Sequence, residues 1–256
     1  MNDKQIKKDI QKLSQKTNRK IIFLKKTPST NQEAKKQAKI GEPEGTIIVA
    51  QKQTQGRGRQ QRTWESPTGG LYFSIILKPN IQPEKTTILP LLASLALSNT
   101  INQNYSVEST IKWPNDVLIN NKKIAGILLE SESTEKQINY IILGIGINLN
   151  NKLSKDLQKI ATTLATEIKK EINTIDFLEK LIQTLDYYYT LFTNKEYTKI
   201  LCEWKQNSDT IGKQVIIKTK TKNITGEAVD INEFGFLKIK TSTAQIITIT
   251  SGDCVY

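Results

Sequence analysis

Glycine is distributed along this sequence in a way that strongly constrains the fold. Seven of the 13 glycines lie between residues 56 and 146, and those at 126, 144 and 146 interrupt apolar segments. Glycine inside a strand marks a point where another backbone or a ligand comes close, because no side chain covers that face. We therefore expect buried strands over 123–131 and 138–149 whose glycines leave room for a flat group.

The stretch from residue 53 to residue 70 differs in composition from the rest of the chain. Of the 37 basic residues 33 are lysine, and three of the four arginines (Arg57, Arg59 and Arg62) fall within six residues. A guanidinium offers a planar set of donors that binds phosphate or carboxylate in two places, which an ammonium cannot do. Gly56 and Gly58 let the backbone turn and direct N–H groups at the same anion. The pattern favours an anion-binding loop, and a solvated surface turn is the alternative.

Length and composition exclude several classes of protein. A chain of 256 residues accommodates one large and one small domain. The absence of histidine excludes histidine-based triads, histidine bases and most zinc sites. Cys202 and Cys254 have no metal-ligand spacing, which is typical of a reducing cytosol. No run approaches the roughly 18 apolar residues of a membrane span, so we expect a soluble, cytoplasmic protein.

The net charge of +12 suggests nucleic-acid binding as one interpretation. The lysines are scattered, however, and no block of five or more basic residues occurs. We therefore favour a solvated lysine-rich surface and expect neither a specific nucleic-acid partner nor a membrane partner.

Hydrophobic periodicity predicts strands and helices in alternation, then a short-stranded segment. Predicted strands cover residues 21–24, 46–53, 71–77, 108–113, 117–119, 123–131 and 138–149. Predicted helices cover 1–18, about 30–41 with Ser29 or Thr30 as the cap, about 86–104, and much of 154–205. Short strands with turns follow over 211–256. A boundary near Asn207 gives domains at 1–206 and 207–256.

Polar side chains stand at the ends of two predicted strands. Pro114 ends strand pairing beside Lys112, Asn115 and Asp116. Sites tend to be built at such rigid ends, although Pro-Asn-Asp is also ordinary turn chemistry. Lys123 opens an apolar strand, so its ammonium is either directed at an anion or extended to the surface.

Four motifs, taken in order, resemble those of the biotin protein ligases. They are Gly56-Arg57-Gly58-Arg59 with Arg62, Trp64 and Ser66-Pro67; Lys112-Trp113-Pro114-Asn115-Asp116; Lys123-Ile124-Ala125-Gly126; and Gly144-Ile145-Gly146-Ile147-Asn148. The resemblance covers about residues 20–256 and implies an α+β fold. This fold is a mixed β-sheet with flanking helices, related to the class II aminoacyl-tRNA synthetase core, followed by a small SH3-like β-barrel. The implied reaction is activation of biotin with ATP to biotinyl-5′-AMP, then transfer of biotin to a lysine of biotin carboxyl carrier protein.

The resemblance also implies roles for single residues. The catalytic residues are Lys123 beside the biotin carboxylate, Arg59 on the phosphate and Asp116 on the incoming lysine. Joining two anions requires fixed positive charge and Mg²⁺. Gln51, Gln53 and Gln55 are all candidates for the biotin ureido group, and Gln53 matches best. The other residues implied to bind biotin are Ser29, Thr30, Asn31, Gly56, Arg57, Gly58, Arg59, Tyr72, Lys123 and Gly126. Those implied to bind ATP are Arg57, Arg59, Arg62, Trp64, Lys112, Asn115 and Asn148.

Other functions stay open as alternatives. A lipoate ligase or octanoyltransferase shares the fold but lacks these forms of the loop and of the Lys112–Asp116 motif. A biotin-responsive repressor carries an N-terminal DNA-binding domain, whereas about 20 residues precede the first strand here. An inactive biotin sensor has no need of Lys123, Arg59 and Asp116. We expect the single-function ligase, as a monomer or homodimer. Its loop over 54–63 has no apolar side chain, so we expect it to be disordered until ligand binds.

Overall fold

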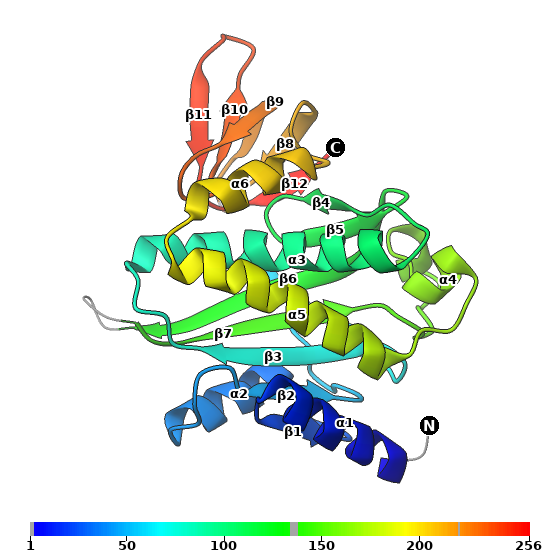
Figure 1. The fold of residues 1–256 in the computed structure, drawn as a ribbon. Helices are drawn as coiled ribbons and strands as arrows, with labels where there is room; N and C mark the ends of the chain where they lie inside the picture. Colours follow the sequence, from blue (N-terminus) through cyan, green and yellow to red (C-terminus); the bar gives the residue numbers. More distant parts are fainter. Residues whose placement is uncertain (1–2, 134–137, 220) are drawn as a thin grey trace.

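A computed structural model describes residues 3–133, 138–219 and 221–256 and contains two β-sheets (Figure 1). The larger has the order β1-β2-β3-β7-β6-β5-β4; β1 and β2 are parallel, and the other neighbours are antiparallel. Its strands are β1 (Ile21–Leu24), β2 (Ile47–Ala50), β3 (Leu71–Leu77), β4 (Thr110–Lys112), β5 (Asp116–Ile119), β6 (Lys122–Ser133) and β7 (Ile138–Ile147).

Helices cover the two faces of this sheet unequally. They are α1 (Asp3–Thr17), α2 (Thr30–Lys39), α3 (Ile88–Asn104), α4 (Leu164–Ile168), α5 (Thr174–Thr193) and α6 (Tyr197–Gln206). In Figure 1, α3 and α5 lie over one face of the sheet. Ile47 and Val49 of β2 pack into the main core, whereas Ile48 between them packs with Ala34 and Ala38 of α2. Because strand side chains alternate in direction, α2 therefore covers the opposite face.

On the face that α2 only partly covers, β6 and β7 lack side chains at their glycines. Leu143, Ile145 and Ile147 enter the main core, so Gly144 and Gly146 point the other way. Gly126 of β6 is the register partner of Gly146. Large apolar side chains thus alternate with glycines along β7. This leaves a hollow on the glycine face and keeps the main core filled on the opposite face.

The smaller sheet is antiparallel, in the order β11-β10-β9-β8-β12. Its strands are β8 (Gln214–Lys218), β9 (Asn223–Ile231), β10 (Leu237–Lys240), β11 (Ile246–Ile249) and β12 (Asp253–Val255). Trp113 anchors the larger domain to this part: its indole N–H donates to Gly235 O at 3.1 Å and its backbone N–H to Thr210 Oγ1 at 3.0 Å. Trp113, in the middle of the 112–116 motif, therefore faces the smaller sheet.

The predicted α+β class is confirmed, with some differences at element ends. Strands at 21–24 and 71–77 have the predicted bounds, whereas β2 ends at Ala50 because the chain turns into the loop. A 3₁₀ helix, Pro83–Thr87, precedes α3. Ser29 occupies the N-cap position of α2, but its side chain makes no capping hydrogen bond. The first two residues of the predicted helix at 1–18 lie outside the described residues.

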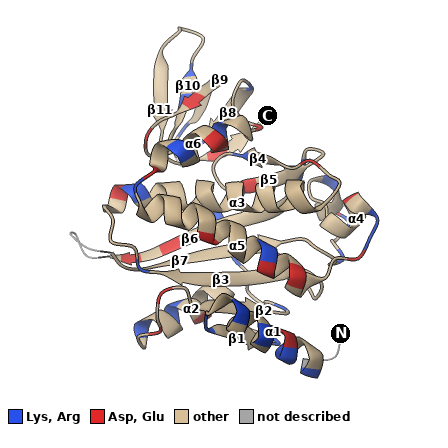
Figure 2. Cartoon of the chain, viewed as in Figure 1, with Lys and Arg blue, Asp and Glu red and all other residues tan. Residues whose placement is uncertain are grey.

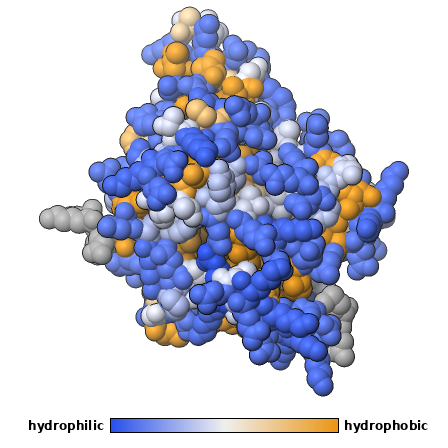
Figure 3. Space-filling view, in the orientation of Figure 1, coloured by the Kyte–Doolittle hydropathy of each residue, from blue (hydrophilic) through white to orange (hydrophobic). Residues whose placement is uncertain are grey.

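Charged residues are interspersed rather than segregated. Figure 2 shows Lys and Arg alternating with Asp and Glu along α1, α5 and α6. The same face is mostly hydrophilic, with small separate hydrophobic areas (Figure 3). Within the described ranges, no helix is both long and apolar enough to cross a membrane.

Candidate active site

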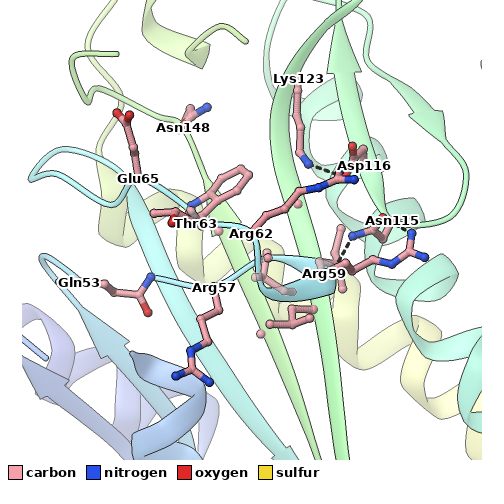
Figure 4. A pocket seen from close by; sticks show the side chains of 18 of the residues that line it. Gln53, Arg57, Arg59, Arg62, Thr63, Glu65, Asn115, Asp116, Lys123 and Asn148 are labelled. Atoms are coloured by element: carbon pink, nitrogen blue, oxygen red, sulfur yellow. Dashed lines mark hydrogen bonds and ion pairs between the residues drawn. The ribbon is translucent and has the colours of Figure 1, made fainter. Parts of the chain in front are cut away.

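A cavity of about 290 Å³ lies over the glycine-lined part of the large sheet (Figure 4). The loop over 53–65, the N-terminus of α2, strands β5 to β7 and residue 253 of β12 contribute to its wall. Fourteen of the residues predicted for the site line it: Ser29, Thr30, Asn31, Gln53, Arg57, Gly58, Arg59, Arg62, Trp64, Asn115, Asp116, Lys123, Gly126 and Asn148.

Trp64 lies on the glycine floor of the cavity. A Cβ added at Gly146 would lie 2.5 Å from Trp64 Nε1, and one at Gly126 would lie 3.2 Å from Trp64 Cζ3. A side chain at Gly146 would therefore displace the indole, and one at Gly126 would crowd both the indole and the Lys123 side chain. Trp64 Nε1 is buried and has no hydrogen-bond partner among the described residues. Since buried donors are normally satisfied, this N–H is available to a ligand acceptor.

Lys123 is turned into the cavity and not out to solvent. Its Nζ lies 2.7 Å from Asp116 Oδ1, and the two side chains are 33% and 23% exposed. The ammonium also lies 5.3 Å from the centroid of the Trp64 ring. Backbone hydrogen bonds to Ile160 and Thr162 fix the start of β6. A half-buried cation with a single carboxylate beside it can accept a second anion.

The three arginines of the loop have different surroundings. Arg59 donates to Asn115 Oδ1 at 3.2 Å and to Gly252 O at 3.1 Å, and both acceptors are uncharged. Burial lowers the pKa of its guanidinium, while Asp253 and Asp116 act in the opposite direction. Arg62 forms an ion pair with Asp253. Arg57 is exposed and points away from Lys123 (Figure 4). Of these three arginines, Arg59 is thus half-buried and has no ion-pair partner among the described residues.

A network of polar side chains fixes the opposite end of the cavity. Gln53 Oε1 accepts from Thr30 N at 2.8 Å and from Thr30 Oγ1 at 3.1 Å. Gln53 Nε2 donates to Ser66 Oγ at 2.8 Å. Asn31 stands over Gly144 and donates to Glu130 at 2.7 Å. These hydrogen bonds hold the amides in one orientation, as selective recognition of a small polar group requires.

Three of the predicted residues do not line the cavity. Gly56 is enclosed by Trp64 O, Ser66 Oγ and Gln53 Nε2, so it permits the turn of the loop instead of facing a ligand. Tyr72 is fully buried below the loop, where its hydroxyl donates to Pro67 O at 2.8 Å and burial raises its pKa. Lys112 points to the smaller sheet, with Nζ 4.2 Å from the centroid of the Tyr256 ring. The sequence prediction did not account for these directions.

Other lining residues carried no signal in the sequence. Leu157, Ile160 and Ala161 follow β7 in an irregular segment that returns to β6, where Ala161 bridges Lys123. Asp253 comes from the smaller sheet. Nothing in the sequence pattern connected Asp253 to the loop. Glycines at 144 and 146 did carry a signal, and Gly144 and Gly146 both line the cavity.

The fold and this site define a class of enzyme. A cavity with a flat floor, a lysine, a half-buried arginine and fixed amides is suited to holding a carboxylic acid against a nucleotide phosphate. Residues 23–148 match the model of the biotin/lipoate A/B protein ligase family, and residues 210–256 match the biotin protein ligase C terminal domain.

Known relatives agree with this match. The chain is 35% identical to the bifunctional ligase/repressor BirA of Bacillus subtilis, over 87% of this chain and 70% of that protein. It is 29% identical to a biotin–[acetyl-CoA-carboxylase] ligase of Paracoccus denitrificans, over 85% and 93%. The structure of the biotin protein ligase from Aquifex aeolicus in complex with biotin and ATP superposes with a TM-score of 0.80 at 30% identity, over 92% and 97%. The chain belongs to the biotin protein ligase family. The predicted family and the predicted class of ATP-dependent ligase are confirmed.

Proposed function

We propose that this chain activates biotin with ATP to biotinyl-5′-AMP and then transfers biotin to one lysine of a biotin carboxyl carrier protein. The observation that carries this assignment is the convergence of Lys123, Asp116 and Arg59 on one cavity with a glycine floor. These residues come from three segments of the chain, and each has a distinct part in the two half-reactions.

In the first half-reaction, a biotin carboxylate oxygen attacks the α-phosphorus of ATP. The new P–O bond forms as the bond to pyrophosphate breaks, so the leaving group carries away negative charge. Lys123 stabilises the carboxylate, and Arg59 stabilises the phosphate oxygens as charge develops. Trp64 Nε1, buried without a partner among the described residues, is available to a ligand oxygen.

In the second half-reaction, the ε-amine of the acceptor lysine attacks the activated carbonyl. A C–N bond forms, the C–O bond to AMP breaks, and the amine loses a proton. Asp116, 2.7 Å from Lys123, is positioned to orient the amine or to take this proton. Lys123 polarises the carbonyl in this step.

The two substrates fit different ends of the cavity. Thr30, Gln53 and Asn31 offer fixed donors and acceptors for the biotin ureido group. Asn148 is buried and lines the cavity, as do the apolar side chains of Leu157 and Ile160. An amide beside apolar side chains suits the adenine, which presents both a flat face and a polar edge.

Mg²⁺ fits this site only as an ion held mainly by ATP. Among the described residues, no group of three or more His, Cys, Asp and Glu could hold a metal. Magnesium commonly uses substrate phosphates with one or two carboxylates, and Asp116 and Asp253 line the cavity. When bound with ATP, the ion supplies neutralisation of phosphate charge.

The assignment is tested with the purified chain, Mg²⁺–ATP and a biotin carrier domain. We expect biotin to appear on a single lysine of the carrier domain, located by mass spectrometry. Parallel reactions with lipoate and octanoate test the alternative function, a lipoate or octanoate ligase of the same fold. Transfer of either acid, with none of biotin, contradicts the assignment.

We also propose that the chain has no specific nucleic-acid partner. The interspersed charges support weak, salt-sensitive binding to duplex DNA. A sequence-specific gel shift that requires biotin and ATP would contradict this and favour a biotin-responsive regulator.

A further inference from the structure

Residues 252–256 contact three of the cations predicted for the site. Gly252 O accepts from Arg59, Asp253 pairs with Arg62, and the Tyr256 ring lies under the Lys112 ammonium. This segment contains β12, which pairs with β8 of the smaller sheet through Cys254↔Ile217 and two further register pairs. The smaller sheet therefore reaches the arginines of the loop although it lies about 190 residues further along the chain.

The contacts of Arg59 and Arg62 are chemically different. Arg59 is bonded to an amide oxygen and a carbonyl oxygen, so its positive charge is still available to a phosphate. Arg62 already has a carboxylate partner, and 62% of its side chain is exposed, against 18% of Asp253. An arginine that is paired and solvated is poorly placed to stabilise a transition state, but it can anchor the backbone that carries Arg59.

We propose that Asp253 is a positioning residue for the adenylation step: its ion pair with Arg62 fastens the loop to the smaller sheet and thereby holds Arg59 toward the ATP phosphates. We call this pair, Arg62 and Asp253, the clasp. The inference rests on the proposed function and adds a residue from the second domain to the machinery of the first.

The effect expected of the clasp is modest, because an exposed ion pair shifts an equilibrium by no more than about fivefold. Breaking it frees the loop in a fraction of molecules, so ATP binding weakens while the chemistry of correctly closed molecules is unchanged. A competing account is that Arg62 binds phosphate itself and that Asp253 only competes for it. The two accounts predict opposite effects for loss of Asp253.

The kinetic test uses Asp253→Asn, Arg62→Gln and the exchanged pair Arg62→Asp with Asp253→Arg. In biotin-dependent ATP–pyrophosphate exchange, we expect each single change to raise the KM for ATP by about two- to fivefold, with kcat within about twofold. The exchanged pair should restore the KM. Asp230→Asn is the matched control, because it breaks ion pairs with Lys205 and Lys238, and none of these three residues lines the cavity. A lower KM for ATP in Asp253→Asn, without rescue by the exchanged pair, overturns the proposal in favour of direct phosphate binding by Arg62.

A second readout needs no activity and therefore separates failure of the clasp from failure of the assigned reaction. Trypsin should cleave after Arg57 about two- to fivefold faster in Asp253→Asn than in the wild type or in Asp230→Asn. Cys254 is buried, which raises the pKa of its thiol to about 11, whereas Cys202 is exposed. Cys254 should resist alkylation in both proteins while Cys202 reacts, which shows that β12 has stayed in place. If Cys254 becomes reactive in Asp253→Asn, the cleavage rate of the exchanged pair is compared with that of the wild type. Equal rates support the clasp, and faster cleavage of the exchanged pair overturns it. If Cys254 stays protected and all variants are cleaved at the same rate, the proposal is overturned.

Discussion

The ammonium of Lys123 lies 2.7 Å from Oδ1 of Asp116, so the cation that we propose for the first half-reaction and the carboxylate that we propose for the second are paired with each other. The two residues stand on adjacent strands, where Asp116 is the register partner of Gly126. When a biotin carboxylate approaches Lys123, it competes with Asp116 for the same ammonium. Release of Asp116 from this pair would make it available to the acceptor amine.

Loss of Lys123 should abolish most adenylation without unfolding the protein. Removing one preorganised stabiliser of a developing anion costs on the order of 10²–10³ in rate. Lys123→Ala should lower biotin-dependent pyrophosphate exchange by that factor and change the Tm by no more than about 5 °C, because the pair is partly exposed. A rate loss below about tenfold would mean that Lys123 does not stabilise the reacting anions and is an ordinary surface lysine.

Loss of Asp116 should impair transfer more than adenylation. Asp116→Asn keeps the size of the side chain but cannot accept the amine proton, and such proton transfers contribute at least about 10²-fold. Single-turnover transfer from preformed biotinyl-5′-AMP measures this step alone. Equal losses in exchange and in transfer would mean that Asp116 acts only by holding Lys123.

Gly146 should be required because of Trp64 and not for folding. Gly146→Ala places a Cβ 2.5 Å from the present position of Trp64 Nε1, so the indole must shift. The φ of Gly146 is not positive, so alanine can adopt the strand backbone, and the Tm should fall by only a few degrees. We expect the KM for biotin to rise about tenfold or more, as overpacking typically has a free-energy cost of 1–3 kcal/mol. The matched experiment makes the Gly146→Ala change in a protein that already carries Trp64→Ala. An undiminished effect in that background would mean that Gly146 contacts the ligand directly.

Fluorescence offers an independent test of the position of Trp64. Trp113 and Trp204 are 2% and 0% exposed, whereas Trp64 lines the cavity. Binding of biotin should therefore change the emission through Trp64, and Trp64→Phe should lose the change. The same response in Trp64→Phe would contradict a ligand site against this indole.

Ligand should protect the loop from trypsin. Residues 54–63 contain no apolar side chain, so we expect a bound anion to add to the few polar contacts that hold them. Arg57 is exposed and Arg59 is half-buried, so cleavage of the free protein should begin after Arg57. Biotin with a non-hydrolysable ATP analogue should protect the site, and the analogue alone should protect it less. Equal cleavage with and without ligand would contradict closure of the loop.

Prediction from sequence succeeded where local chemistry decides the outcome. The strands at 21–24 and 71–77 are short apolar runs between polar or turn residues, so their bounds follow from periodicity. The glycines at 144 and 146 predicted a flat floor because absence of a side chain is itself a local property. The arginine-rich loop was likewise identified from its composition.

The sequence could not predict side-chain directions or partners that come from distant parts of the chain. Lys112 was predicted to bind ATP, and the structure shows Tyr256 beside its ammonium. Tyr72 was predicted to bind biotin, and the structure shows its hydroxyl donating to Pro67 O. Both roles stay predictions. Asp253 reaches the cavity from a separate sheet, and no spacing rule connects it to Arg62. The domain boundary near Asn207 and the oligomeric state stay predictions.

The most direct test of the central claim is exchange of labelled pyrophosphate into ATP by the purified chain. Exchange reports adenylate formation alone, independent of any carrier protein. The account predicts exchange that depends on biotin, requires Mg²⁺ and is lost in Lys123→Ala. Exchange supported by lipoate or octanoate but not by biotin would contradict it.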